Sequence, residues 1–91
     1  MSSAVTDNAA EHRFEMKAGD HLAVAYYTLG SGIITFTHTE VPTALSGQGI
    51  GSKLARGALE QVRARGLKVV PQCPFISGFI AKNAEFADLI A

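Results

Sequence analysis

A glycine-rich turn between a strand-forming segment and an amphipathic segment constrains this chain more than any other feature. Ile33 to Val41 is rich in β-branched and aromatic residues, which predicts a strand that ends before Pro42. Between about Gly49 and Arg65, apolar residues recur every four positions, as on the buried face of a helix. The local chemistry therefore predicts the order strand, turn and helix, with three alternating glycines at the junction: Gly47, Gly49 and Gly51.

The remaining segments predict an α/β (α+β) fold built on a mixed sheet. Turns at Gly19-Asp20 and at Gly30–Gly32 join three strands into an antiparallel meander. The crossover helix then leads to a short strand that should pair in parallel with the third, and a second helix packs on the sheet. We expect strands at 12–16, 21–29, 33–41 and 67–70, helices at 49–65 and 75–82, and a final turn or two at 84–90.

The period of two along the third strand assigns its side chains to opposite faces of the sheet. We expect one face to carry Ile34, Phe36, His38 and Glu40, and the other to carry Thr35, Thr37, Thr39 and Val41. His38 and Glu40 would then lie roughly 7 Å apart on one face and line one cleft.

The charge balance argues against a nucleic-acid partner. Among the 91 residues, eight basic side chains match eight acidic ones, whereas nucleic-acid binders usually carry a basic excess. A local basic cluster follows the glycines, and such clusters are more often a solvated helix face than an anion site. It consists of Lys53, Arg56, Arg63, Arg65 and Lys68.

Other features of the sequence restrict the cellular compartment in which the chain is expected to act. No apolar run approaches the roughly 18–20 residues that a membrane span needs, and the first residues lack the blocks of a signal peptide. Cys73 is the only cysteine, which points to a reducing compartment and a cytoplasmic location. We expect residues 1–11 to be a flexible tail and residues 12–91 to form one domain. The three histidines show no metal-ligand spacing.

The glycine-rich turn also has the chemistry of an anion site. Glycines let the backbone approach a ligand closely, and the first amides of a helix are unpaired and carry partial positive charge, which suits a pyrophosphate. A Walker loop does not fit, because Ser52 separates Gly51 from Lys53, and a dinucleotide fingerprint fails because Ser52 replaces its third glycine. The alternative interpretation is a glycine-rich loop that serves only the turn.

A third phosphate-binding pattern, Gln/Arg-x-x-Gly-x-Gly/Ala, matches Ser46–Gly51 at both glycine positions, Gly49 and Gly51. It does not match at the first position, where Ser46 stands in place of Gln or Arg. With this loop, the chain resembles the small, single-domain members of the GNAT superfamily of N-acetyltransferases. The resemblance covers about residues 12 to 90, and it departs again at Ala84, where a proline often follows Lys-Asn. The matching segments are His38–Pro42, Gly47–Gly51 with Leu54, Pro71–Phe75, Phe79–Asn83 and Asp88–Ile90.

The resemblance implies a minimal GNAT-like fold that binds acetyl-CoA or coenzyme A. In that fold the pantetheine arm lies between two splayed parallel strands and pairs with the strand before the loop, here at Thr39, Glu40 and Val41. The pyrophosphate lies on the loop and the helix start, with Lys53 as a charge partner. The implied coenzyme-binding residues are Thr39, Val41, Gly47, Gln48, Gly49, Ile50, Gly51, Ser52 and Lys53.

The candidate catalytic residues are His38, Cys73 and Glu40. Family members resemble one another around a strand histidine and a later cysteine, which are His38 and Cys73 here. A histidine suits general-base work near neutral pH, and a thiolate could accept the acetyl group first. Direct transfer to an amine and a two-step route through acetyl-Cys73 both remain open. Each residue also has a structural interpretation: packing for Cys73, a satisfied imidazole for His38 and solvation for Glu40.

Three functions follow from these observations. The first is a small N-acetyltransferase with an unknown amine acceptor. The second is a non-catalytic acyl-CoA-binding module, because the chain lacks the N-terminal helices that shape an acceptor pocket in GNAT enzymes. The third is a scaffold whose glycines serve only the turn. The oligomeric state is open, since exposed strand edges would permit pairing without requiring it.

Overall fold

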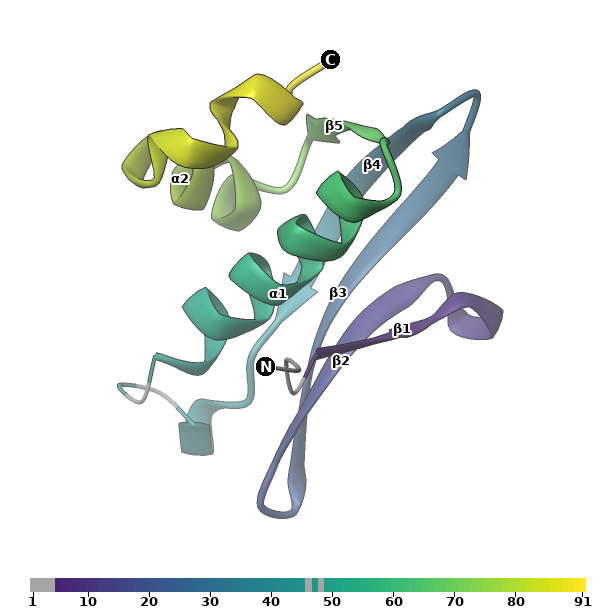
Figure 1. Ribbon diagram of the computed structural model, residues 1–91. Coiled ribbons are helices and arrows are strands. Elements are labelled where there is room, and N and C mark those ends of the chain that lie inside the picture. Colours follow the sequence, from purple (N-terminus) through teal and green to yellow (C-terminus); the bar gives the residue numbers. More distant parts are fainter. Residues whose placement is uncertain (1–4, 46, 48) are drawn as a thin grey trace.

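A computed structural model of the chain describes residues 5–45, 47 and 49–91 (Figure 1). Strands dominate the first half of the chain and helices the second half. The elements are β1 Val5–Asn8, the 3-10 turn η1 Ala9–Glu11, β2 Arg13–Ala18, β3 His21–Gly30, β4 Ile33–Glu40, η2 Thr43–Leu45, α1 Ile50–Ala64, β5 Lys68–Pro71, α2 Pro74–Lys82 and η3 Ala84–Leu89.

The strands form one mixed sheet in the order β1-β2-β3-β4-β5. Neighbours pair antiparallel from β1 to β4, whereas β4 and β5 pair in parallel. The parallel pair is joined through α1, because a chain must cross from one end of the sheet to the other to continue in the same direction. The predicted α+β architecture, with a parallel strand after a crossover helix, is therefore confirmed.

The structure corrects the predicted flexible tail of residues 1–11 over its described part, residues 5–11. Val5–Asn8 forms the edge strand β1, and η1 follows it directly. Side chains far along the sequence hold this strand: Gln61 Nε2 donates to the Val5 carbonyl at 2.8 Å, and Tyr27 Oη donates to Asp7 at 2.6 Å. The polar segment contains one large apolar residue, so its strand depends on these distant partners and escaped prediction.

A β-bulge in β4 reverses the face of the sheet from which the side chains of its last residues project. Tyr27 of β3 pairs with Phe36, but Tyr26 pairs with His38, so Thr37 is an extra residue on β4. Since a bulge breaks the period of two, Phe36 is buried in the core while His38 joins Tyr26 on the opposite face. The prediction that His38 and Glu40 share a face with Ile34 and Phe36 is wrong for this reason.

The core lies between one face of the sheet and the two helices. The predicted stripe of α1 is buried, and α2 adds Ile76 and Ile80 to the same cluster. The sheet contributes fully buried aromatic and aliphatic side chains to it, among them Phe14, Ile34 and Phe36. No described helix is long and apolar enough to cross a membrane.

Most of the predicted basic cluster is engaged within the chain. Arg56 bonds Glu85 and Asn83, while Arg63 bonds Asp88 and the Glu85 carbonyl, so both attach the C-terminal segment to α1. The hydrogen bond from Arg63 lowers the pKa of the Asp88 carboxyl. Lys68 donates to the Asp88 carbonyl and Arg65 pairs with Asp7. These contacts give the cluster a structural role in four of its five members.

Candidate functional site

The parallel pair β4 and β5 separates partway along β4. Their register ends at Phe36 and Pro71, whereas β4 continues to Glu40. Cys73 N–H donates to the Phe36 carbonyl at 2.9 Å, which extends the backbone link between the two segments just past that register. The β5-facing edge of β4 therefore runs beyond its partner strand from Thr37 onward. A bulge at the same place leaves Thr37 outside the regular ladder, as bulges beside active sites often do.

Two glycines with positive φ shape the turn into α1. Gly47 has φ 81° and Gly49, the N-cap of the helix, has φ 72°, a region that other residues rarely adopt. The first helical bond runs from Lys53 N–H to the Gly49 carbonyl at 3.1 Å. The amides of Ile50, Gly51 and Ser52 come earlier in the helix and have no partner within it, so they form its positive end.

A hollow of about 230 Å³, called the loop pocket here, lies between the end of β4 and the start of α1. It contains most of the coenzyme-binding residues predicted from the sequence, together with Leu45 and Phe75. Its lining consists of Val41, Leu45, Gly47, Gly49, Ile50, Gly51, Ser52 and Phe75. Backbone amides, glycines and apolar side chains therefore surround one space at the predicted site.

At Gly51, packing rather than backbone conformation disfavours a side chain. A Cβ atom at this position would lie 2.6 Å from Cζ of Phe75, far inside van der Waals contact. The Phe75 ring, 41% exposed, thus rests on the first turn of α1. Phe75 was not among the predicted site residues, because the contact joins the starts of two helices that are distant in sequence.

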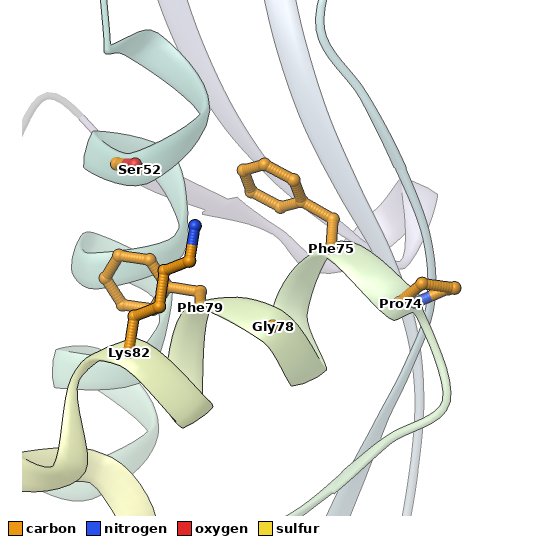
Figure 2. Close-up of a pocket in the computed structure, with 6 residues that line it drawn as sticks. All are labelled: Ser52, Pro74, Phe75, Gly78, Phe79 and Lys82. Atoms are coloured by element: carbon orange, nitrogen blue, oxygen red, sulfur yellow. The ribbon is translucent and has the colours of Figure 1, made fainter.

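A second hollow of about 220 Å³, the interhelical pocket, lies beside Phe75 between α1 and α2 (Figure 2). It shares Ser52 and Phe75 with the loop pocket. Its lining consists of Ser52, Pro74, Phe75, Gly78, Phe79 and Lys82. The sequence contained a signal for it: positions 75, 78, 79 and 82 follow helical spacing and so share one face of α2.

Cys73 and Thr39 meet beneath the point where the strands separate. Cys73 Sγ lies 3.2 Å from Thr39 Oγ1, and the thiol is buried with 4% exposure. Thr39 pairs with Ala25, whose side chain belongs to the core, so both groups lie on the helix side of the sheet. The structure therefore brings together one predicted catalytic residue and one predicted coenzyme-binding residue.

His38 and Glu40 lie on the outer face, away from Cys73. His38 Nε2 is 3.1 Å from Glu40 Oε2, and both side chains are about 60% exposed. The His38 ring stacks on Tyr26 at a centroid distance of 6.3 Å, and Arg13 donates to Tyr26 Oη. The bulge at Thr37 thus separates the imidazole from the thiol and pairs it with the carboxylate.

Two predicted coenzyme-binding residues fall outside this arrangement. Lys53 is exposed and lines neither pocket, whereas Lys82 of α2 reaches the interhelical pocket from the other side. Gln48, like the departing position Ser46, lies outside the described residues. Like Phe75, Lys82 is a candidate that sequence reasoning missed, since no local pattern connects it to the glycine turn.

The fold and the glycine turn define the class of the protein. The chain superposes along its full length, with a TM-score of 0.74 and 27% identity, on 91% of a GCN5-like protein from Staphylococcus aureus solved in solution by NMR. The model of the GCN5-related N-acetyltransferase family matches residues 13–89. The chain belongs to this family.

Relatives of known sequence agree with this membership. The chain is 36% identical over 64 residues to Protein NATD1 of Homo sapiens and of Bos taurus, and 33% identical to that of Danio rerio. These matches cover 70% of this chain and 57–58% of the relatives. The chain therefore corresponds to somewhat more than half of each relative.

Proposed function

We propose that this chain binds acetyl-CoA or coenzyme A and transfers the acetyl group to an amine. The observation that carries the proposal is the loop pocket, which joins the free edge of β4 to the glycine-capped start of α1. A strand edge followed by a helix start suits a ligand with an amide-containing arm and then a pyrophosphate. Family membership supports acetyl transfer as the activity.

The residues of β4 and α1 divide the binding between them. Thr39 and Val41 offer backbone groups to the amides of the pantetheine arm, as a neighbouring strand would. The amides of Ile50, Gly51 and Ser52 donate to the pyrophosphate, and Gly47 and Gly49 supply the positive-φ turn. In this proposal Phe75 closes the pocket on the side of α2.

The outer-face pair His38 and Glu40 is the candidate base for direct transfer. Acetyl-CoA, when bound, supplies a thioester carbonyl that an amine can attack. His38 takes the proton from the amine as its nitrogen bonds to the carbonyl carbon, and Glu40 holds the imidazole at 3.1 Å. The carbon–sulfur bond breaks, and the sulfur leaves as a thiolate. Since His38 is on the outer face, the acceptor amine approaches from that face.

The two-step route through Cys73 has weaker geometric support. Cys73 Sγ is buried against Thr39, while His38, which would have to activate it, projects from the opposite face. In such a route the nucleophile and the base must lie within hydrogen-bonding distance of each other. We therefore favour direct transfer, and we place the activity in the cytoplasm because the buried free thiol suits a reducing compartment.

Calorimetric titration with acetyl-CoA and with coenzyme A tests the proposal. The native chain is compared with Gly49→Val and with Gly32→Val as the matched control. Both glycines have positive φ and open space where a Cβ atom would lie, so the two variants carry similar strain, but only Gly49 lies at the loop pocket. We expect Gly49→Val to lose binding and Gly32→Val to retain it.

The other outcomes separate the alternative functions. Equal binding of both ligands without turnover of any amine would identify a non-catalytic coenzyme-binding module. Absence of binding by the native chain would contradict the proposal and leave the glycines with only the turn as their purpose.

A further inference from the structure

Tyr26 is the central residue in a row of three side chains across the outer face of the sheet. It pairs with Arg13 of β2 on one side and with His38 of β4 on the other. The bulge at Thr37 creates this row, because it brings His38 opposite Tyr26. Direct cross-strand neighbours are close enough for their side chains to interact. Tyr26 does not belong to the described hydrophobic core, so core packing does not explain the ring at this position.

Arg13 holds the hydroxyl end of Tyr26. Arg13 Nη1 donates to Tyr26 Oη at 3.2 Å, and Arg13 Cζ lies 5.7 Å from the ring centroid. Glu15 holds Arg13 in turn, and it also accepts a hydrogen bond from Asn8 of β1. The bonds from Arg13 and Asn8 lower the pKa of the Glu15 carboxyl, which keeps this ion pair charged. The ring of Tyr26 is therefore anchored through β2 to the edge strand β1.

The imidazole of His38 has one contact at its plane and one at its edge. Its ring lies nearly parallel to that of Tyr26, with an interplanar angle of 15°. Its Nε2 atom lies 3.1 Å from Oε2 of Glu40. An ionised carboxylate only accepts hydrogen bonds, so Nε2 carries the proton of the neutral imidazole. Nδ1 is then the nitrogen whose lone pair can take a proton from an amine.

The ring of Tyr26 restricts a side chain that would otherwise rotate. The His38 side chain is 61% exposed, and exposed side chains change rotamer within nanoseconds. A hydrogen bond at Nε2 alone leaves the imidazole able to swing about that contact, whereas a parallel ring beside it also restricts its plane. Such placement matters for the rate, because a displacement of about 1 Å at a reacting group can cost about 10²-fold.

We infer that Tyr26 is a positioning residue for the acetyl transfer. Its ring, held by Arg13, fixes the plane of the His38 imidazole. Nε2 of His38 then stays on Glu40, while Nδ1 takes the proton from the acceptor amine as the amine nitrogen bonds to the thioester carbonyl carbon. The carbon–sulfur bond breaks and the sulfur leaves as a thiolate. The inference rests on the proposed function, because it assumes that His38 is the base.

Steady-state acetyl transfer by Tyr26→Leu and Tyr26→Phe tests the role of the ring. Leucine keeps an apolar side chain on the strand without the ring, and it should lower kcat about tenfold or more. The KM values for acetyl-CoA and for the amine should stay within about twofold, because binding is not affected. Phenylalanine restores the ring without the hydroxyl, so kcat should return to within about threefold of the native value.

Thr28→Ala is the matched control on the same strand. Thr28 is the next residue of β3 on the outer face, it is exposed, and it pairs with Thr35 rather than with His38. This variant should leave both kcat and KM unchanged.

NMR of the histidine ring nitrogens, recorded without ligand, separates positioning from a general structural role. With the imidazole neutral, the native chain should show His38 protonated at Nε2 and bare at Nδ1. The ¹⁵N shifts of Tyr26→Leu should move toward those of a mixture of both tautomers, whereas Tyr26→Phe should keep the native shifts.

Arg13→Met provides a second measurement if Tyr26→Leu does not fold. It removes the same hydrogen bond as Tyr26→Phe, so each variant should lower kcat by about threefold or less. The double variant should lose no more than either single variant, because only one bond is removed. Losses that multiply in the double variant would contradict the anchoring of Tyr26 by Arg13.

The remaining outcomes distinguish this inference from the proposed function. Native kcat in Tyr26→Leu, equal losses in the leucine and phenylalanine variants, or a loss confined to KM overturns this inference alone. A native His38 protonated at Nδ1 also overturns it. Absence of acetyl transfer by the native chain overturns the proposed function, and this inference with it, because no base is then required.

Discussion

At the scale of single residues, Thr37 decides which chemistry can occur at this site. As the extra residue of a bulge, it directs His38 and Glu40 to the outer face, while Thr39 returns to the side of Cys73. Without the bulge, the period of two would place the imidazole and the carboxylate among core side chains. The imidazole is instead exposed beside a carboxylate and a tyrosine ring, which suits proton transfer with an incoming amine.

This arrangement predicts opposite outcomes for the two candidate catalytic side chains. Cys73→Ala should retain acetyl transfer to a panel of amines, because the thiol contacts Thr39 rather than the imidazole. His38→Gln should lower the rate about 10²-fold or more, the usual loss when a general base is removed. Turnover of the native chain and of each variant on the same amine panel checks this. An acetylated Cys73 found by mass spectrometry, with an inactive Cys73→Ala, would instead support the two-step route.

At the scale of elements, β1 shows how a short polar strand is held by side chains from the rest of the fold. Asp7 of β1 accepts a hydrogen bond from Tyr27 of β3 and pairs with Arg65, which follows α1. Gln61 of α1 binds the backbone of the same strand. The edge of the sheet is thus attached to α1 through polar contacts as well as through Val5 in the core.

The Tyr27 contact makes stability depend on pH in the alkaline range. Burial, followed by the hydrogen bond to Asp7, raises the pKa of Tyr27 to about 12 from its ordinary value of 10.0. The folded chain therefore holds this proton more tightly than the unfolded chain. The stabilisation is complete below pH 10 and is lost as the pH rises toward 12. The free energy of unfolding should fall by about 2 kcal/mol more in the native chain than in Tyr27→Phe between pH 9 and pH 12.

Urea denaturation of the two proteins across this range checks the prediction. The native chain should be the more stable one at pH 9, and the difference should shrink as the phenol ionises. Parallel pH profiles for the native chain and Tyr27→Phe would contradict it.

The elements that sequence patterns predicted are those with strong local signals. β3, β4, α1 and α2 lie within a residue or two of their expected bounds, because period, glycine and proline mark their ends. The strand β1 and the bulge at Thr37 were missed, since both depend on pairing with distant residues. The same holds for the site: the glycine turn was predicted from its own residues, whereas Phe75 and Lys82 required the packing of α2 against α1.

At the scale of the whole molecule, the two helices are held in place so that both pockets open beside the start of α1. Arg56 and Arg63 of α1 bond the segment that follows α2, and the ring of Phe86 in that segment packs 6.0 Å from the ring of Phe79 in α2. The relative position of α1 and α2 determines the space of the two pockets that share Phe75. The structural role of the arginines therefore supports the ligand site from a distance, through the placement of α2.

The central claim is that the free edge of β4 and the first turn of α1 form one coenzyme site. The most direct measurement is a ¹H–¹⁵N NMR titration of the native chain with acetyl-CoA, which reports on each backbone amide. We expect the largest shift changes at Ile50, Gly51 and Ser52 and along Thr39–Val41, with the amides of β1 and β2 unchanged. Saturation with no change at α1, or changes confined to the outer face of the sheet, would contradict the account.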